Sequence, residues 1–340
     1  MSAKSSSCID VLYREPAGRS AIHIVDAPTA NSLLSQDEAI EVVRQCFADL
    51  DSGLSIGFPP LSGHGSDKAT RFGVKSGYDG RRQLPGLKVG SYWPHNTDRG
   101  LPNHGSTTLL LDDATGFPLA LVSATYLNAL RTAASDAVAV DLLARKNASV
   151  LAVFGTGHQA FHEAIAISRV RSLSRVFVCG RDTGRAAALA QRLSAAGLDA
   201  EAASADKALE QADMVVTATA SRAPLFSECA VKPGTHVSAM GADGPGKQEL
   251  PAALAARAEL FADALDQTFS IGEFQYLAET EERDRVTAIG SVINGRSRGR
   301  SSDDAITIYD SSGISLQDLA VAGYVFEKAL AAGLTQFVDV

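Results

Sequence analysis

A glycine-rich turn between an apolar run and a helical segment is the feature that most restricts how this chain folds. Residues 150–160 read V-L-A-V-F-G-T-G-H-Q-A, a β-branched strand pattern that leads into G-x-G-x-x-A. In such a unit Gly155 makes the strand-to-helix turn, Gly157 lets the backbone approach a pyrophosphate, and Ala160 keeps the helix close to the strand. The N-terminus of the helix offers free N–H groups to the anion. The pattern predicts a dinucleotide-binding βα unit, with an ordinary βα turn as the alternative.

Further strand and helix patterns alternate after this turn. Buried-strand patterns occur at 175–179, 214–220, 235–241 and 260–262, and helical patterns occur at 160–168, 184–196 and 206–211. Strands that alternate with helices over about 120 residues are typical of a parallel, doubly wound sheet. We therefore expect an α/β fold in which residues 146–313 form a Rossmann dinucleotide-binding domain.

The segments on either side predict a second domain. Residues 35–51 have the apolar spacing of an amphipathic helix, and Ser35 with Glu38 forms a capping box. Strand patterns follow at 70–76, 86–92, 106–112 and 118–123, and helical patterns at 125–144 and 315–332. We expect residues 21–145 and 314–340 to form one α+β domain with an antiparallel or mixed sheet. The Ser-rich residues 1–20 are expected to be a disordered tail.

Composition argues against several classes of partner. The net charge of −8 disfavours nucleic acid, because phosphate binding requires a basic face. No apolar stretch approaches the ~18 residues of a membrane span, and the N-terminus lacks a signal-peptide core. The four cysteines lack C-x-x-C spacing and are typical of reduced thiols in a cytoplasmic protein. We also expect no metal site, since His158 and His162 lie four residues apart without an evident third ligand.

Three polar residues occupy positions where packing alone does not require them. Lys88 lies inside an apolar strand, Arg131 lies in an alanine-rich helix, and Asp243 follows a Rossmann strand, where loops line the ligand crevice. Each has a structural alternative, namely an outward-facing lysine, a structural ion pair and a turn aspartate. As a set they favour imine or amine chemistry, with a carboxylate and an ammonium that handle a proton and an arginine that binds a carboxylate.

Several segments resemble the ornithine cyclodeaminase/μ-crystallin family, in order along the chain from about residue 30 to residue 330. They are residues 86–89, 100–102, 127–134, 154–159, 241–250 and 306–313. The resemblance implies an N-terminal substrate and dimerisation domain, a Rossmann domain and a homodimer. It also implies an enzyme that acts on a small-molecule imino or amino acid.

The resemblance also implies roles for individual residues. It places Lys88 and Asp243 in catalytic positions, and Arg131 and Thr107 in positions for the substrate carboxylate. Residues that lie where the family holds the cofactor are Thr217, Thr219 and Ser311. The glycine-rich turn adds Gly155, Thr156, Gly157, His158 and Gln159 to the expected cofactor residues. The sequence does not decide which of Lys88 and Asp243 donates the proton.

Two departures from the family pattern bear on the substrate. Leu61 stands where many members have an arginine for the substrate carboxylate, and Lys75 stands where members often have methionine. Together with residues 92–96 and 103–107, these features resemble the branch that contains iminosuccinate reductases and ectoine-degradation proteins. We hypothesise that Lys75 and Lys88 favour an acidic imino acid such as a dicarboxylate.

The end of the second Rossmann strand indicates the cofactor. An NAD-specific fold usually has an acidic residue there for the ribose 2′-hydroxyl, but this chain has Gly180 followed by Arg181. Arg181 suits a 2′-phosphate, whereas Asp182 suits the ribose, and we expect NADP(H) to be favoured with NAD(H) as the alternative.

The sequence therefore predicts an NAD(P)H-dependent reductase of an α-imino acid, or the reverse amino acid dehydrogenase. One alternative is an ornithine cyclodeaminase with bound NAD, against which Leu61 counts. The other is a crystallin-like cofactor-binding protein, against which the joint presence of Lys88, Arg131 and Asp243 counts.

Overall fold

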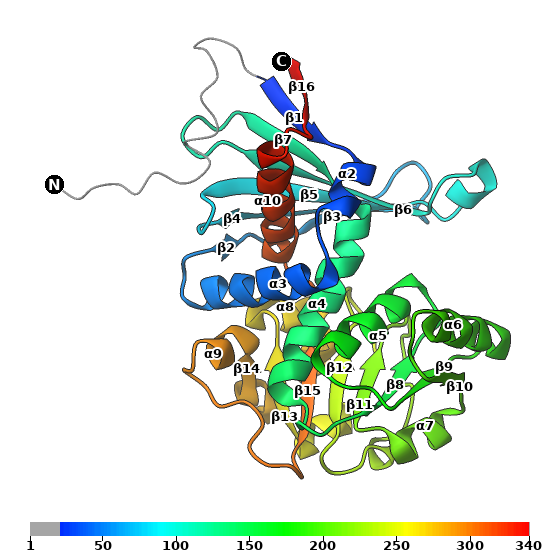
Figure 1. The fold of residues 1–340 in the computed structure, drawn as a ribbon. Coiled ribbons are helices and arrows are strands. Elements are labelled where there is room, and N and C mark those ends of the chain that lie inside the picture. Colours follow the sequence, from blue (N-terminus) through cyan, green and yellow to red (C-terminus); the bar gives the residue numbers. More distant parts are fainter. Residues whose placement is uncertain (1–20, 340) are drawn as a thin grey trace. The chain divides into compact units, whose positions relative to one another are not determined.

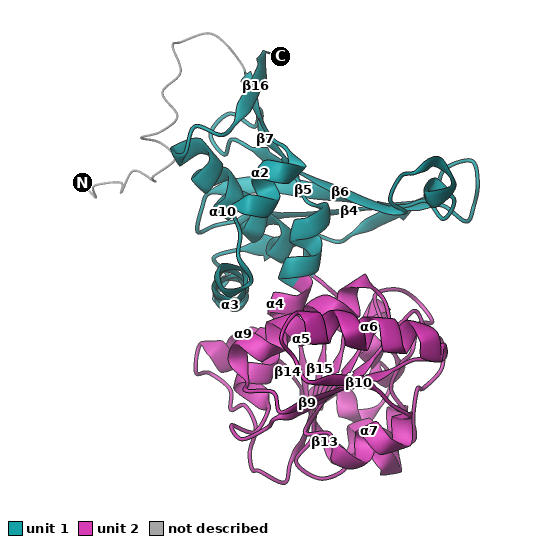
Figure 2. Cartoon of the chain, turned by 45° about the vertical axis from the view of Figure 1, so that its right-hand side comes forward, with its two compact units in different colours: residues 1–131, 314–340 teal, residues 132–313 magenta. Residues whose placement is uncertain are grey.

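The structure, a computed structural model, describes residues 21–339 and divides into two compact units (Figure 1, Figure 2). Unit 1 comprises the chain up to Arg131 and from Ile314 onward, and unit 2 comprises Thr132–Gly313. The boundary between Gly313 and Ile314 lies at the expected residue. The boundary between Arg131 and Thr132 lies inside a helix, earlier than the expected boundary near residue 145. The tail expected at residues 1–20 lies outside the described residues.

Unit 2 is built on a fully parallel eight-stranded sheet (Figure 1). In spatial order its strands are β10 (Ala200–Ala202), β9 (Arg175–Cys179), β8 (Val150–Phe154), β11 (Met214–Thr217), β12 (His236–Ala239), β15 (Ile306–Asp310), β13 (Ala258–Ala262) and β14 (Val286–Ala288). The central strands are buried at almost every residue, as a parallel sheet covered on both faces requires. This confirms the predicted Rossmann fold.

Helices connect these parallel strands. They are α5 (His158–Val170), α6 (Thr183–Ala195), α7 (Ala205–Gln211), α8 (Leu265–Ile271) and α9 (Ile289–Ile293), with short 3-10 turns η2 (Glu228–Ala230), η3 (Ala252–Arg257), η4 (Glu273–Leu277) and η5 (Glu281–Arg285). Helix α5 begins directly after the glycine-rich turn, with Gly157 at its N-cap. Because the strands are parallel, the loops that follow them gather at one edge of the sheet, where α/β proteins bind their ligands.

Unit 1 contains a mixed eight-stranded sheet. Its order is β16 (Gln336–Asp339), β1 (Ala21–Val25), β7 (Pro118–Ser123), β6 (His104–Leu111), β5 (Leu84–Tyr92), β4 (Arg71–Asp79) and β2 (Ile56–Gly57), and β3 (Leu61–Gly63) also pairs with β4. All neighbours are antiparallel except β1 and β7. Strands β1 and β16 join the two ends of the described chain in one sheet.

Helices cover one face of this sheet (Figure 1). They are α2 (Ala27–Ser32), α3 (Gln36–Asp51) and α10 (Ser315–Ala331), and unit 1 also holds η1 (Asn96–Arg99) and the first turns of α4 (Thr125–Leu143). Helix α3 begins at the predicted capping box, in which the Ser35 hydroxyl accepts from the Glu38 amide and the Glu38 carboxylate accepts from the Ser35 amide. Helix α10 packs against α3, β4 and β5.

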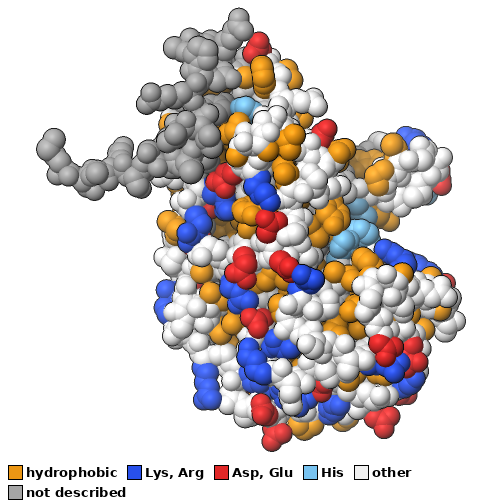
Figure 3. Space-filling view, viewed as in Figure 1, with side chains coloured by type: hydrophobic (Ala, Val, Ile, Leu, Met, Phe, Trp, Pro, Cys, Tyr) orange, Lys and Arg blue, Asp and Glu red, His pale blue; other side chains and the backbone are white. Residues whose placement is uncertain are grey.

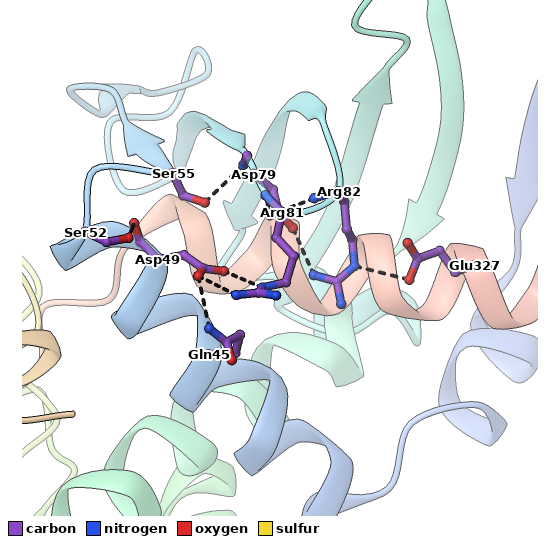
Figure 4. A network of polar contacts seen from close by, with 9 residues as sticks. Gln45, Asp49, Ser52, Ser55, Asp79, Arg81, Arg82 and Glu327 are labelled. Atoms are coloured by element: carbon purple, nitrogen blue, oxygen red, sulfur yellow. Dashed lines mark hydrogen bonds and ion pairs between the residues drawn. The ribbon is translucent and has the colours of Figure 1, made fainter. Parts of the chain in front are cut away.

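Ion pairs hold the turn between β4 and β5 against α3 and α10 (Figure 4). Asp49 on α3 accepts two hydrogen bonds from Arg81, at 2.7 and 2.8 Å. Arg82 donates to Asp79 at 3.0 Å and to Glu327 on α10 at 3.2 Å. Bidentate and partly buried pairs of this kind are stronger and more specific than isolated surface pairs. They fix α10 to the hairpin, which matters because α10 contributes to the site described below.

None of the helices formed by residues 21–339 combines the length and the apolar character needed to cross a lipid bilayer. On the face that Figure 3 shows, basic and acidic side chains are interspersed instead of gathering by sign.

Candidate functional site

A row of polar side chains crosses the helix-covered face of the unit 1 sheet. Lys75 on β4 lies directly opposite Lys88 on β5, and Lys88 lies opposite Thr108 on β6. Residues that pair directly across strands project from the same face, so these side chains form one row. Lys88 is 6% exposed and Thr108 is fully buried.

Helices α4 and α10 bring polar partners to Lys88. Its ammonium lies 2.8 Å from Asp318 Oδ2 on α10 and donates to Asn128 Oδ1 on α4 at 2.8 Å. Arg131, one turn after Asn128, donates to Asn128 at 2.7 Å, to Gln317 at 2.9 Å and to Asp318 Oδ1 at 2.9 Å. A single buried carboxylate therefore pairs with both cations, and we call these five residues the Lys88 cluster.

Burial and neighbouring charges shift the pKa values of Lys88 and Asp318 in this cluster. The pKa of Lys88 is lowered to about 7, chiefly by burial and also by the nearby Arg131 and Lys75, while Asp318 opposes the shift. Burial alone would raise the pKa of Asp318, but the three cations outweigh it, so that pKa lies below its ordinary value. Asp318 therefore stays ionised near neutral pH, while Lys88 exchanges between its charged and neutral forms.

The cluster retains hydrogen-bonding capacity that fits a bound carboxylate. A guanidinium has five N–H donors, and three side chains among the described residues accept from Arg131, so two donors remain. The buried Thr108 hydroxyl, beside Lys88 in the row, has no hydrogen-bond partner within residues 21–339. Because an unsatisfied buried hydroxyl is unfavourable, a ligand oxygen at this place would stabilise it.

Thr107, predicted for the substrate carboxylate, does not join this row. It pairs with Val89 instead of Lys88, so it projects from the opposite face of the sheet, where it is exposed. The threonine that faces Lys88 is its neighbour Thr108. Sequence reasoning could not separate the two because a shift of one residue in strand register reverses the face.

In unit 2 the glycine-rich turn has the geometry that a dinucleotide pyrophosphate requires. Gly155 has φ +133°, and a Cβ there would lie 2.5 Å from the carbonyl oxygen of Ala218, so only glycine fits. No atom lies within 4 Å of the place of a Cβ on Gly157, which leaves space at the start of α5. Open space at the N-terminus of a helix fits the phosphates of a nicotinamide dinucleotide.

The side chains of this turn interact with the next turn of α5. Gln159 donates to the buried Glu163 at 2.7 Å, and the Nε2 atoms of His158 and His162 lie 3.2 Å apart. Burial lowers the pKa of His162 to about 4, with His158 adding to the effect. Within the described residues, no group of three or more metal-ligating side chains is present.

The loop after β9 places Arg181 and Asp182 differently. Both side chains are exposed, but Asp182 is the N-cap of α6, and its Oδ1 accepts from the Arg185 amide at 3.0 Å. The carboxylate of Asp182 is therefore engaged by the helix, whereas Arg181 directly follows Gly180 at the end of the strand.

The other expected cofactor residues follow β11 and β15, and buried acids hold them. The Thr217 hydroxyl is fully buried and donates to Glu249 at 2.8 Å, and the Thr219 amide donates to Glu249 at 2.6 Å. Ser311 donates to Asp263 at 3.3 Å. Thr217 thus lies at the expected strand end, but its hydroxyl is engaged inside the protein.

Asp243 lies in the loop after β12, in unit 2, whereas the Lys88 cluster lies in unit 1. Its side chain is 61% exposed and forms an ion pair with Lys247, four residues along the same loop. The predicted site residues therefore form two groups, one in each unit.

Sequence reasoning missed four residues of the site. They are Thr108, Asn128, Gln317 and Asp318. A signal was present for the last two, because Gln317 and Asp318 are adjacent polar residues in the first turn of a helix whose next five residues are apolar, and both are buried. Polar residues at positions that helical spacing would bury indicate a paired or functional role.

The chain is similar to known proteins along most of its length. The model of the ornithine cyclodeaminase/mu-crystallin family matches residues 24–333. The iminosuccinate reductase of Paracoccus denitrificans is 38% identical over 310 residues, covering 91% of this chain and 97% of that protein. An alanine dehydrogenase of Archaeoglobus fulgidus is 36% identical over 313 residues, covering 90% and 95%.

Solved structures give the same result. The Paracoccus denitrificans iminosuccinate reductase in complex with NAD⁺ has a TM-score of 0.87 at 36% identity and covers 94% of this chain and 100% of that one. The Thermococcus litoralis Δ1-pyrroline-2-carboxylate reductase with NADH and L-proline has a TM-score of 0.86 at 26% identity, covering 93% and 99%. The chain therefore belongs to the ornithine cyclodeaminase/mu-crystallin family.

Proposed function

We propose that this protein is a nicotinamide-dependent oxidoreductase that reduces the C=N bond of an α-imino acid to an amino acid, and catalyses the reverse oxidation. The observation that carries the proposal is the Lys88 cluster, which joins a guanidinium with free donors to an ammonium whose pKa is about 7. Its relatives include an iminosuccinate reductase, a Δ1-pyrroline-2-carboxylate reductase and an alanine dehydrogenase, which all act on imino or amino acids.

The cofactor site would lie at the glycine-rich turn, where Gly155 and Gly157 leave room for the phosphates. When bound, the nicotinamide supplies a hydride to the imine carbon or accepts one from the amine carbon. The remaining requirement falls on the protein, because hydride addition to a C=N carbon is easier when the nitrogen carries a proton.

The Lys88 cluster supplies this proton and binds the carboxylate. Arg131 binds the α-carboxylate with the two N–H donors that its internal partners leave, and the Thr108 hydroxyl donates to the same ligand. Lys88 holds the exchangeable proton, since burial places its pKa where both forms are populated at neutral pH. Asp318 keeps Lys88 and Arg131 in place and stays ionised itself.

Asp243 would orient the substrate nitrogen. Its carboxylate is exposed at the edge of the Rossmann sheet where ligands bind, and Lys247 holds it there. In this role it accepts a hydrogen bond from the substrate nitrogen and orients it for reaction. Asp243→Asn and Lys88→Met variants separate the two roles, because loss of the proton donor changes the pH profile of kcat/KM, whereas loss of the orienting group lowers it at all pH values.

The charge of the cluster favours a dicarboxylate substrate. Lys75, Lys88 and Arg131 face the single ionised Asp318, so the cations exceed the anion by two when Lys88 is protonated. A substrate with two carboxylates offsets this positive charge more fully than a monocarboxylate does. Lys75, at the edge of the row, is the residue placed to bind the second carboxylate.

For the cofactor we propose a preference for NADP(H) over NAD(H). Three relatives of known structure hold NAD⁺ or NADH. In this chain Asp182 caps α6, and the exposed Arg181 follows Gly180, so a cation and not a free carboxylate is available at the end of β9. An arginine there attracts a 2′-phosphate.

We further propose a homodimer formed through the open face of the unit 1 sheet. Ile24, Leu121, Leu109 and Leu87 pair in one row across four strands on the face opposite Lys88, and all four are only partly buried. An antiparallel sheet that faces water normally carries polar residues there, so a continuous apolar row indicates an interface. One relative of known structure is an archaeal alanine dehydrogenase dimer.

The proposed activity is tested by following NADPH and NADH oxidation with a panel of 2-oxo acids, each mixed with ammonia or methylamine. Oxaloacetate, glyoxylate and pyruvate are compared, with cyclic imino acids in parallel. We expect the fastest turnover with the imine of oxaloacetate and a faster rate with NADPH. Absence of turnover in the panel, with ammonia released from ornithine and NAD⁺, would instead identify a cyclodeaminase.

A further inference from the structure

The loop that carries Asp243 is closed at its base by one buried carboxylate. The loop leaves β12 at Gly241, and Glu249 follows it. Glu249 Oε2 accepts from the Gly241 amide at 2.8 Å, so the two ends of the loop are joined by a hydrogen bond. Lys247 adds contacts within the loop, to Asp243 and to the Gly241 carbonyl oxygen.

The same carboxylate also holds the neighbouring loop. Glu249 Oε1 accepts from the Thr219 amide at 2.6 Å, and Oε2 accepts from the Thr217 hydroxyl at 2.8 Å. Because β11 and β12 are adjacent parallel strands, these bonds connect two consecutive loops at the ligand-binding edge of the sheet (Figure 1). A Cβ on Gly241 would lie 2.6 Å from the Glu249 carboxyl, so the close approach requires glycine.

A second acid fixes the backbone of the first. The carboxylate of Glu273 on η4 accepts from the Glu249 amide at 2.9 and 3.1 Å and from the Leu250 amide at 2.8 Å. Glu249 is fully buried and Glu273 is 5% exposed. Both the backbone and the side chain of Glu249 are thus held, which leaves the loop bases little freedom.

We propose that Glu249 is a positioning residue, whose carboxylate fixes the loop of Asp243 relative to the cofactor loop at Thr219. The inference rests on the proposed function in one respect, namely that Asp243 contacts the substrate nitrogen. Three donors converge on Glu249, two of them on Oε2 and one on Oε1, and such hydrogen bonds favour the carboxylate form. Burial raises the pKa of this carboxyl, while the same hydrogen bonds oppose the rise.

The Glu249→Gln variant tests this arrangement with almost no change in volume. An amide NH2 in place of either oxygen faces a backbone N–H, because Thr219 donates to Oε1 and Gly241 donates to Oε2. Either orientation of the glutamine therefore leaves one backbone amide without an acceptor. Glu279→Gln is the matched control, because Glu279 is an exposed glutamate of the same unit.

The first measurement is hydrogen exchange of the Thr219 and Gly241 amides in the full chain. We expect exchange of at least one of them to accelerate by about tenfold or more in Glu249→Gln and to be unchanged in Glu279→Gln. Unchanged exchange in Glu249→Gln would overturn the proposal. If that variant does not fold, hydrogen exchange in the wild-type chain provides the test. Rapid exchange of both the Thr219 and the Gly241 amides there would be incompatible with their hydrogen bonds to Glu249.

The second measurement separates positioning from mere stabilisation. In Glu249→Gln we expect kcat for imine reduction to fall by about tenfold or more at temperatures where the chain is fully folded, with a smaller fall in Thr217→Val, which removes one of the three donors. A faster exchange with unchanged kcat and KM would refute the positioning role. Hydrogen exchange is measured without substrate. Inactivity of the wild type towards imines would therefore count against the proposed function and not against the positioning of the two loops by Glu249.

Discussion

Replacement of Asp318 by asparagine should move the pH dependence of catalysis to lower pH. Asp318 is the acid that stabilises the charged form of Lys88, at an N–O separation of 2.8 Å. Asparagine keeps the size of the side chain and a hydrogen-bonding oxygen, but it removes the negative charge. Burial and the neighbouring cations Arg131 and Lys75 then act on Lys88 without this opposing charge, and its pKa falls below its wild-type value of about 7.

The size of the shift follows from the separation of the charges. At an effective dielectric constant of about 20, unit charges 2.8 Å apart interact by about 6 kcal/mol, which is an upper bound. Opposite charges at close range shift a pKa by about 1–3 units. A drop of one unit from about 7 lowers the protonated fraction of Lys88 at pH 7 about fivefold, and a drop of two units lowers it about fiftyfold.

The assay is the pH profile of kcat/KM for imine reduction between pH 5 and 9. Lys88 donates its proton in the reductive direction, so the wild-type rate should fall as the pH rises through about 7. In Asp318→Asn the same fall should begin one to three units lower, within the range given for such pairs. NMR of ¹³C-labelled lysine side chains reports the pKa of Lys88 independently of the rate.

Asp49→Asn is the matched control for this experiment. Asp49 is also a buried acid of unit 1 and pairs with Arg81, but its contacts lie at the β4–β5 turn (Figure 4). Its loss should reduce stability without moving the pH profile. A profile that stays at the same pH in Asp318→Asn, with the lysine NMR titration unchanged, would refute the assignment of the titrating group to Lys88.

Three further variants test the other parts of the proposal. Arg181→Ala should raise KM for NADPH about ten- to a hundredfold and leave KM for NADH unchanged, since a charge-assisted hydrogen bond contributes about 1.5–3 kcal/mol. An equal change for both cofactors in steady-state kinetics would contradict the 2′-phosphate role. Lys75→Ala should lower kcat/KM for a dicarboxylate imine about tenfold or more, with little change for a monocarboxylate imine; equal losses would show that Lys75 does not select the second carboxylate. Leu109→Glu should give a monomer in analytical ultracentrifugation, because a charge in an apolar interface is unfavourable. The control variant Leu265→Glu, in unit 2, should remain a dimer. A dimer in both variants would place the interface elsewhere.

Local patterns were enough to predict the Rossmann unit and helix α3. The strand at Val150–Phe154, the turn at Gly155 and the capping box at Ser35 each depend on residues that are adjacent in sequence. The structure confirms them because burial on both faces of the parallel sheet and cap hydrogen bonds leave direct sequence signatures. Strands β1 and β16 carry no such signature, since each is short and they pair across the length of the chain.

The candidate site was predicted less completely for a related reason. The sequence singled out Lys88 and Arg131 because a cation in an apolar segment is unusual, but their shared counter-ion Asp318 comes from a helix beyond unit 2. Thr107 and Thr108 differ only in the face from which they project, and strand register decides that face. Glu249 lies within a segment that resembles the family, yet its role depends on hydrogen bonds to two loops that sequence spacing does not reveal.

The insertion of unit 2 into unit 1 has a consequence for biosynthesis. Residues 132–313 leave the ribosome as a contiguous segment with its own core, before α10 and β16 have been synthesised. Domains generally fold as units during synthesis, so the Rossmann unit is able to fold while the sheet of unit 1 still lacks helix α10 and the edge strand β16. Lys88 and Arg131 are made early and receive Asp318 last. A nascent chain that stalls before α10 therefore has a Rossmann unit but no assembled Lys88 cluster.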